Sequence, residues 1–136
     1  DVSVQAQILN LVHKLKTEHG MAWLFMAHDI NVVRAIADRV IVLYAGRVME
    51  TGSVSEVLQK PLHPYTRELL NSAPGTVELA GNTDVRLSET DVDSDVLQQG
   101  CVYRKRCPLA DELCAAAAPA MKTSADRSVA CFHVET

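Results

Sequence analysis

The chain has 136 residues, of which 48% are hydrophobic and 22% charged, a composition typical of globular proteins. Acidic side chains outnumber basic ones by 17 to 13, so the formal net charge of −4 gives no reason to expect binding to nucleic acid. The longest apolar run, residues 21–27, is far shorter than the roughly 20 residues that span a bilayer, and no basic-then-apolar leader opens the chain. We therefore expect a protein of the cytosol.

Apolar residues at helical spacing predict a first helix from about residue 3 to residue 19, ended by Gly20. Residues 21–27 are all apolar without alternation, a pattern typical of a strand covered on both faces in a parallel sheet. Such a strand needs neighbours, which we expect in residues that precede Asp1. Asp29 then predicts the N-cap of a short helix over residues 30–37.

Two short strands, residues 40–44 and 47–50, are predicted around a turn at Ala45-Gly46. Ser53 with Glu56 predicts a capping box for a helix that reaches about Gln59. A further short helix is expected to begin at the His63-Pro64 dipeptide. Residues 76–99 carry six acids and one base, which predicts a linker.

This order of elements predicts the closing section of an α/β sheet domain over residues 1–60. Residues 61–136 are expected to form a largely irregular extension that contains the acidic linker. All four cysteines lie within residues 101–131 of that extension.

Three segments resemble motifs of ABC-transporter ATPases, a P-loop NTPase family. Residues 1–7 resemble the D-loop and the helix after it, and Ala27-His28-Asp29 resembles the end of the switch-histidine strand. Residues 37–52 resemble the hairpin that follows in those proteins. The resemblance implies that the chain is the carboxyl-terminal part of such an ATPase domain.

Two further segments narrow the resemblance to the oligopeptide, dipeptide and nickel importer branch. His63-Pro64-Tyr65-Thr66 resembles a motif in the carboxyl-terminal extension of that branch, and residues 101–114 resemble its cysteine-bearing end. We expect His63 and Tyr65 to pack the extension against the ATPase body.

The resemblance assigns two residues to the nucleotide. A histidine just past the carboxyl end of a buried strand, such as His28, lies where α/β sheets bind ligands and can contact a γ-phosphate or an attacking water. The alternative is that His28 merely caps the next helix. Asp1 would be the D-loop aspartate that reaches the partner ATPase, or else a solvated terminal residue.

Three motifs needed for ATP hydrolysis are not found in the sequence. It has no Gly-Lys pair of a phosphate-binding loop, no Leu-Ser-Gly-Gly signature and no apolar strand that ends in Asp-Glu. We expect that the chain by itself neither holds ATP tightly nor hydrolyses it.

Four clustered cysteines in a cytosolic protein point to metal more readily than to disulfides. The spacing between them is wider than the close pairs of most zinc sites, and it suits a [4Fe–4S] cluster whose charge Arg104, Lys105 and Arg106 would offset. Some members of the resembled branch carry such a cluster, which implies the ligand set Cys101, Cys107, Cys114 and Cys131. Zinc or reduced thiols remain alternatives, and His133 could replace one ligand.

The expected function is that of an ATP-binding subunit of an importer for peptides or a related solute. In the intact subunit, binding of ATP and Mg²⁺ would close a dimer of ATPase subunits on the cytoplasmic face of the cell membrane. Its partners would be a second ATPase subunit, membrane permease subunits and, indirectly, an extracytoplasmic solute-binding protein. The alternatives are a non-enzymatic module for metal binding or subunit interaction, or the remnant of a truncated gene.

Overall fold

The computed structural model describes residues 2–72 and 99–134. The chain divides into two compact units between Ala37 and Asp38: unit 1 precedes this point and unit 2 follows it. The predicted acidic linker and its neighbours, residues 76–98, lie outside the described residues. The domain boundary near residue 60, predicted from the order of elements, stays a prediction.

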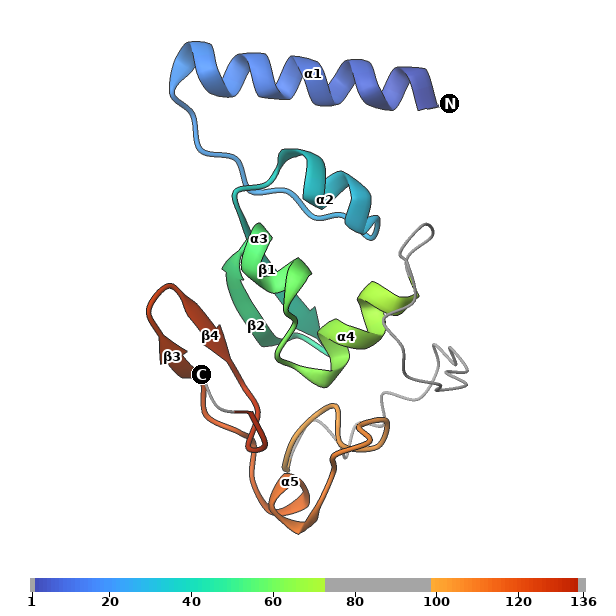
Figure 1. Cartoon of the computed structure of the whole chain (residues 1–136), viewed down its shortest axis with the longest axis vertical. Coiled ribbons are helices and arrows are strands. Elements are labelled where there is room, and N and C mark those ends of the chain that lie inside the picture. Colours follow the sequence, from blue (N-terminus) through green and yellow to red (C-terminus); the bar gives the residue numbers. More distant parts are fainter. Residues whose placement is uncertain (1, 73–98, 135–136) are drawn as a thin grey trace. The chain divides into compact units, whose positions relative to one another are not determined.

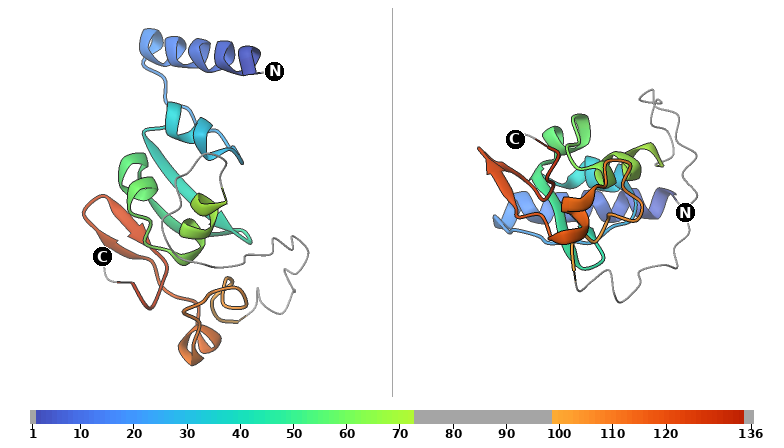
Figure 2. Two further views of the ribbon diagram at one scale, coloured as in Figure 1. Left: turned by 45° about the vertical axis from the view of Figure 1, so that its right-hand side comes forward. Right: turned by 90° about the horizontal axis from the view of Figure 1, so that it is seen from below.

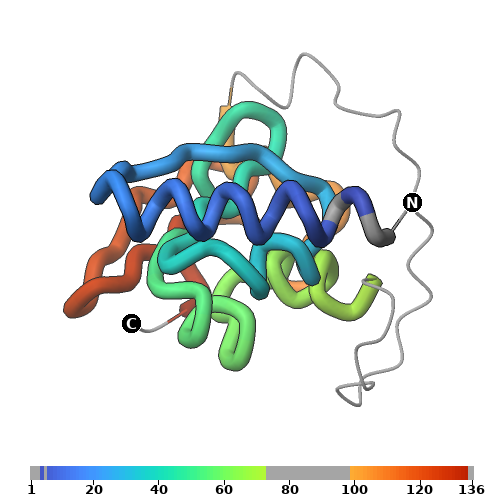
Figure 3. The backbone as a smooth tube through the Cα atoms, turned by 90° about the horizontal axis from the view of Figure 1, so that it is seen from above, coloured from blue at the N-terminus to red at the C-terminus, as the bar shows by residue number. Residues whose placement is uncertain are grey.

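Unit 1 contains the two predicted helices. Helix α1 (Val2–His19) is followed by Gly20 with φ of 62°, a left-handed conformation that suits glycine after a helix end (Figure 3). Helix α2 (Ile30–Ile36) begins after Asp29, whose side chain accepts a hydrogen bond of 2.8 Å from the backbone N–H of Asn31. Both helix boundaries lie close to the predicted ones.

The predicted strand over residues 21–27 is not formed. The segment is assigned no secondary structure, and the side chains of Leu24 and Met26 are 91% and 92% exposed. A strand exists only by hydrogen bonding to a neighbour, and no described residue supplies that neighbour here. The apolar pattern alone therefore did not decide the structure of this segment.

Unit 2 is built on one antiparallel sheet of four strands in the order β1-β2-β4-β3 (Figure 1). The strands are β1 (Arg39–Tyr44), β2 (Arg47–Ser53), β3 (Lys122–Ser124) and β4 (Arg127–Val129). The predicted turn between β1 and β2 is present, with positive φ at both Ala45 (48°) and Gly46 (74°), as in the turns that match strand twist. The mixed α/β content is thus confirmed, with an antiparallel sheet in unit 2.

The second hairpin, which the sequence pattern did not indicate, completes this sheet. Its strand β4 pairs with β2, so that Val129 lies opposite Glu50 and Ser128 opposite Thr51 (Figure 1 and Figure 2). Ala130 continues the contact by donating to the carbonyl of Met49 at 2.9 Å. The extension thereby shares a sheet with the predicted first hairpin.

Unit 2 also contains three short helices: α3 (Val54–Gln59), α4 (Pro64–Asn71) and α5 (Glu112–Ala116). Each is capped by the side chain of the preceding residue: Ser53, His63 or Asp111. Val57 of α3 and Val129 of β4 are fully buried in unit 2. Within the described ranges, no helix has the length and apolarity that crossing a membrane requires.

Candidate metal centre

Cys101 and Cys114 are joined directly through the backbone. The N–H of Cys101 donates to the carbonyl of Cys114 at 2.7 Å. The preceding residue, Gly100, has φ of 79°, and a Cβ placed on it would lie 2.5 Å from the carbonyl oxygen of Cys114. Only glycine fits this close approach, so Gly100 lets the first cysteine loop meet α5.

An aromatic cluster fixes the loop from Cys101 to Cys107. Tyr103 is 2% exposed, its ring contacts those of Tyr44 and Tyr65, and its hydroxyl donates to the Glu68 carboxylate. The backbone N–H of Cys107 then donates to the Tyr103 carbonyl at 3.0 Å. The position of Cys107 therefore follows from the packing of a tyrosine that the sequence analysis did not single out.

Arg106 closes this cluster by forming an ion pair with the same Glu68 carboxylate. Arg104 directs its guanidinium to backbone carbonyls, those of Gln99 and, at 3.4 Å, Cys101. Arg106 thus already neutralises a carboxylate, whereas it was expected to offset the charge of a metal centre.

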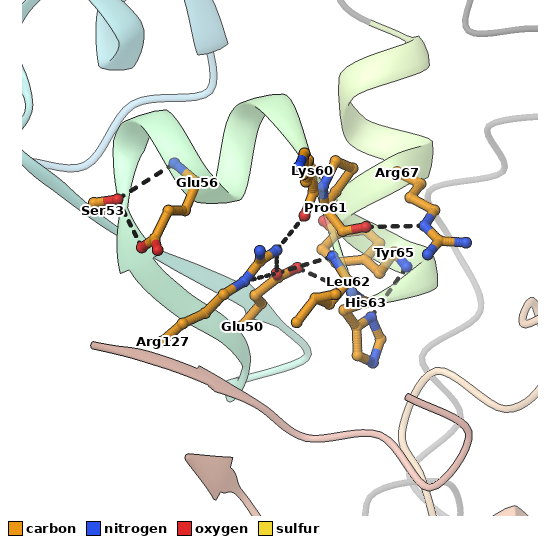
Figure 4. A network of polar contacts seen from close by, with 10 residues as sticks. All are labelled: Glu50, Ser53, Glu56, Lys60, Pro61, Leu62, His63, Tyr65, Arg67 and Arg127. Carbon is orange, nitrogen blue, oxygen red and sulfur yellow. Dashed lines mark hydrogen bonds and ion pairs between the residues drawn. The ribbon is translucent and has the colours of Figure 1, made fainter. Parts of the chain in front are cut away.

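Cys131 is positioned by a buried polar network centred on Glu50 (Figure 4). The Glu50 carboxylate is fully buried and accepts hydrogen bonds of 3.0 Å from the backbone N–H groups of Leu62 and His63. It also forms an ion pair with Arg127 of β4, whose Nε donates at 3.1 Å. This network attaches the start of α4 and strand β4, which leads to Cys131, to the centre of β2.

His63, the middle of this network, has a structural role. Its Nδ1 accepts from the Tyr65 N–H at 3.0 Å, and the residue is 1% exposed. Burial, the largest cause, lowers the pKa of His63 to about 4, although the Glu50 charge acts in the opposite direction. His63 is therefore neutral near pH 7 and serves as a helix cap.

All four cysteines are free thiols gathered in unit 2. Cys101, Cys114 and Cys131 are buried, and Cys107 is half-buried. Burial raises the pKa of the Cys107 thiol, a hydrogen bond from the Leu109 backbone lowers it, and the charges of Cys131, Cys101 and Cys114 raise it, so the other three thiols lie within electrostatic reach of Cys107. Four such donors fit an iron–sulfur cube chemically.

The spacing of the sulfurs bears on which metal they suit. In a tetrahedral four-thiolate zinc site the sulfurs lie about 3.8 Å apart, since each Zn–S bond is about 2.3 Å. Among the described residues, no three cysteine sulfurs come within 4.8 Å of one another. A cube holds its thiolates farther apart, because each binds a different iron atom.

One mixed group of ligand atoms is much tighter. Asp111, Cys114 and His133 each offer one atom, and the three atoms lie within 4.8 Å of one another. His133 was predicted only as a replacement for one cysteine ligand, and Asp111 was not predicted as a ligand. An Asp placed three residues before a cysteine at a helix start is the signal that could have drawn attention to it.

The two residues predicted to act at the ATP site, His28 and Asp1, are not part of unit 2. His28 belongs to unit 1, where it is exposed in the bend between the apolar segment 21–27 and Asp29. Asp1 lies outside the described residues. The roles of both residues stay predictions.

Comparison with known proteins gives one family. Residues 49–114 match the model of the oligopeptide/dipeptide transporter C-terminal region. The chain is 42% identical to the oligopeptide transport ATP-binding protein OppF of Escherichia coli over 99% of its own length and 41% of that protein. It is 44% identical to OppF of Haemophilus influenzae, over 98% of the chain and 41% of the relative.

A third relative is the di/tripeptide transport ATP-binding protein DppF of Pseudomonas aeruginosa. It is 38% identical over 99% of the chain and 42% of the relative. The chain therefore spans about two fifths of the length of these curated relatives.

Proposed function

Because the chain belongs to the oligopeptide/dipeptide transporter ATP-binding family, as its carboxyl-terminal part, we propose that it works within an ATPase subunit that energises peptide import. The similarity to OppF, which covers 99% of the chain, is the observation that carries this proposal. The proposed partners are a second ATPase subunit, membrane permease subunits and a solute-binding protein outside the membrane. The subunit would lie on the cytoplasmic face of the membrane.

In this proposal, His28 acts on the γ-phosphate of bound ATP. The residue follows an apolar segment whose Leu24 and Met26 side chains are exposed and could pack against other parts of the subunit. Asp29 caps α2 directly after it, which fixes the backbone beside the imidazole. Positioning and charge stabilisation are most of phosphoryl-transfer catalysis, so one well-placed imidazole has a large effect.

We also propose that Asp1 contacts the partner ATPase and that the four cysteines hold a [4Fe–4S] cluster with a structural role. Burial of three of the thiols and the mutual electrostatic influence of all four support the second part. Bound there, the cluster would link the loop at Cys101 and Cys107, helix α5 and Cys131, two residues after the end of β4.

The nucleotide role is tested in a chimera, because the chain spans only part of its relatives. The aligned segment of OppF from Escherichia coli is replaced by this chain, and ATP hydrolysis and peptide uptake are measured. His28→Ala should lower hydrolysis by about 100-fold or more, the range for loss of one group that stabilises transition-state charge. His13→Ala, an exposed histidine of α1, is the matched control and should leave hydrolysis unchanged. Equal activity of both variants would remove His28 from the mechanism.

The cluster is tested on the chain itself, purified without oxygen. Iron and acid-labile sulfide near four per chain, lost in Cys107→Ser, are the expected result. Zinc or no metal in the anaerobic protein would refute the cluster and leave the transporter assignment standing.

A further inference from the structure

Three side chains at the end of unit 2 direct their ligand atoms to one point. The Cys114 sulfur lies 3.6 Å from Nε2 of His133, and the same nitrogen lies 3.3 Å from Oδ2 of Asp111. Thiolate, imidazole and carboxylate are the three ligand types that zinc takes from proteins.

The two distances match those of a zinc site. Bonds of about 2.3 Å to sulfur and about 2.0–2.1 Å to nitrogen, at a tetrahedral angle of about 109°, put these two atoms about 3.6 Å apart. Bonds of about 2.0–2.2 Å to nitrogen and oxygen put those atoms about 3.4 Å apart. Both values agree with the observed separations of 3.6 and 3.3 Å.

Hydrogen bonds outside the group of ligand atoms help to hold the ligand residues in place. Asp111 caps α5 through its other oxygen, Oδ1, which accepts from the Cys114 N–H at 3.0 Å, while Oδ2 pairs with His133. His133 lies between Phe132 and Val134, whose carbonyls both accept from the Lys122 ammonium at 3.2 and 3.1 Å. Cys114 is buried, whereas Asp111 and His133 are exposed and give a metal ion an entry path.

We propose that Asp111, Cys114 and His133 form a mononuclear zinc site, which shares Cys114 with the four-cysteine set. Binding releases the thiol proton of Cys114 to solvent, and the fourth coordination position is open to water. Cys114 cannot ligate zinc here and serve the cluster at once. Zinc and the cluster should therefore exclude each other, an expectation that rests on the cluster of the proposed function. The zinc site itself does not rest on that proposal.

The site is tested by titrating the whole chain with Co²⁺, which reports thiolate ligation by a charge-transfer band and tetrahedral geometry by intense visible bands. The starting variant combines Cys101→Ser, Cys107→Ser and Cys131→Ser, so that Cys114 is the remaining thiol. We expect one Co²⁺ per chain with a single-thiolate spectrum, displaced by one equivalent of Zn²⁺. A folded variant, shown by circular dichroism, without this band would overturn the site.

If the triple variant does not fold, two single substitutions in the chain with all four cysteines test the site. His133→Gln should weaken Zn²⁺ binding, measured against a competing chelator, by at least about tenfold, the change that loss of even an outer-shell partner produces. Asp111→Asn should also weaken it, whereas Asp126→Asn, an exposed acid of the β3–β4 turn, should not. Zinc affinity equal to wild type in His133→Gln would overturn the site, because the cysteines alone would then account for binding.

Competition with the cluster is measured separately. Zinc added before reconstitution with iron and sulfide should block cluster formation in the wild-type chain and fail to block it in His133→Gln. Loss of the cluster signal in both proteins to the same extent would refute the competition. Failure of reconstitution without zinc would refute the cluster instead, so the two ideas fail differently.

Discussion

Replacing Glu50 by alanine should strongly destabilise unit 2. The Glu50 side chain is fully buried, and the Arg127 side chain that pairs with it is 14% exposed. The substitution leaves this guanidinium buried without its partner, which costs about 3–5 kcal/mol when a buried pair is broken. It also removes the acceptor of the Leu62 and His63 N–H groups, each worth about 1–3 kcal/mol if left unsatisfied. Since these losses overlap, we expect about 4 kcal/mol in total.

The assay is urea unfolding followed by circular dichroism, together with the reaction rate of the thiols with a chromogenic disulfide. The matched control is Asp126→Asn, which removes an exposed ion pair to Arg39 that also links the two hairpins. An exposed pair contributes about 0–1 kcal/mol, so this variant should unfold almost as the wild type does. Because the Glu50 network leads to Cys131, only Glu50→Ala should also expose that thiol. A loss below about 1 kcal/mol in Glu50→Ala would refute the reasoning.

Three other predictions concern Gly100, His63 and the thiols. Gly100→Ala should lower the free energy of unfolding by about 1–3 kcal/mol, because the added Cβ would lie 2.5 Å from the Cys114 carbonyl oxygen. It should also speed the reaction of the Cys101 thiol with a chromogenic disulfide. Unchanged urea unfolding would contradict this prediction. Because the pKa of His63 is lowered to about 4 on folding, about 3 kcal/mol of stability present above pH 6.5 should be lost as the pH falls through 4. The control is His63→Asn, which keeps a capping side chain but does not titrate. If lowering the pH reduces the urea midpoint of the wild type no more than that of His63→Asn, the stability effect assigned to His63 is wrong. Burial raises the pKa of Cys107 and Cys114, so a bound metal ion must displace thiol protons. The affinity for Co²⁺ should therefore increase from pH 7 to pH 9. An affinity that does not change with pH would exclude thiolate ligands.

Local features were predictable from the sequence because each depends on residues only a few positions apart. The Ala45-Gly46 turn has positive φ at two adjacent positions, and glycine, which adopts positive φ without strain, occupies the second. The caps at Asp29 and Ser53 need an acceptor side chain two or three residues before an N–H group. Family membership was likewise recognisable, because it rests on the order of short motifs.

The apolar segment 21–27 shows where this local reasoning stops. Its composition predicted a buried strand, but strand formation depends on a hydrogen-bonding neighbour, which residues 2–72 and 99–134 do not provide. The composition of a segment thus indicates that it can form a buried strand, but a neighbouring strand must be present for the buried strand to form.

The arrangement of the candidate metal ligands was decided by tertiary structure. Glu50 and Arg127 are 77 positions apart, and Cys114 and His133 are 19 apart, so no periodicity encodes either contact. The sequence showed that four cysteines and His133 share one region, and therefore that metal chemistry was available. Only the fold selected which donors meet, because the pairing of β4 with β2 and the cap at Asp111 set the positions of side chains that the sequence leaves independent.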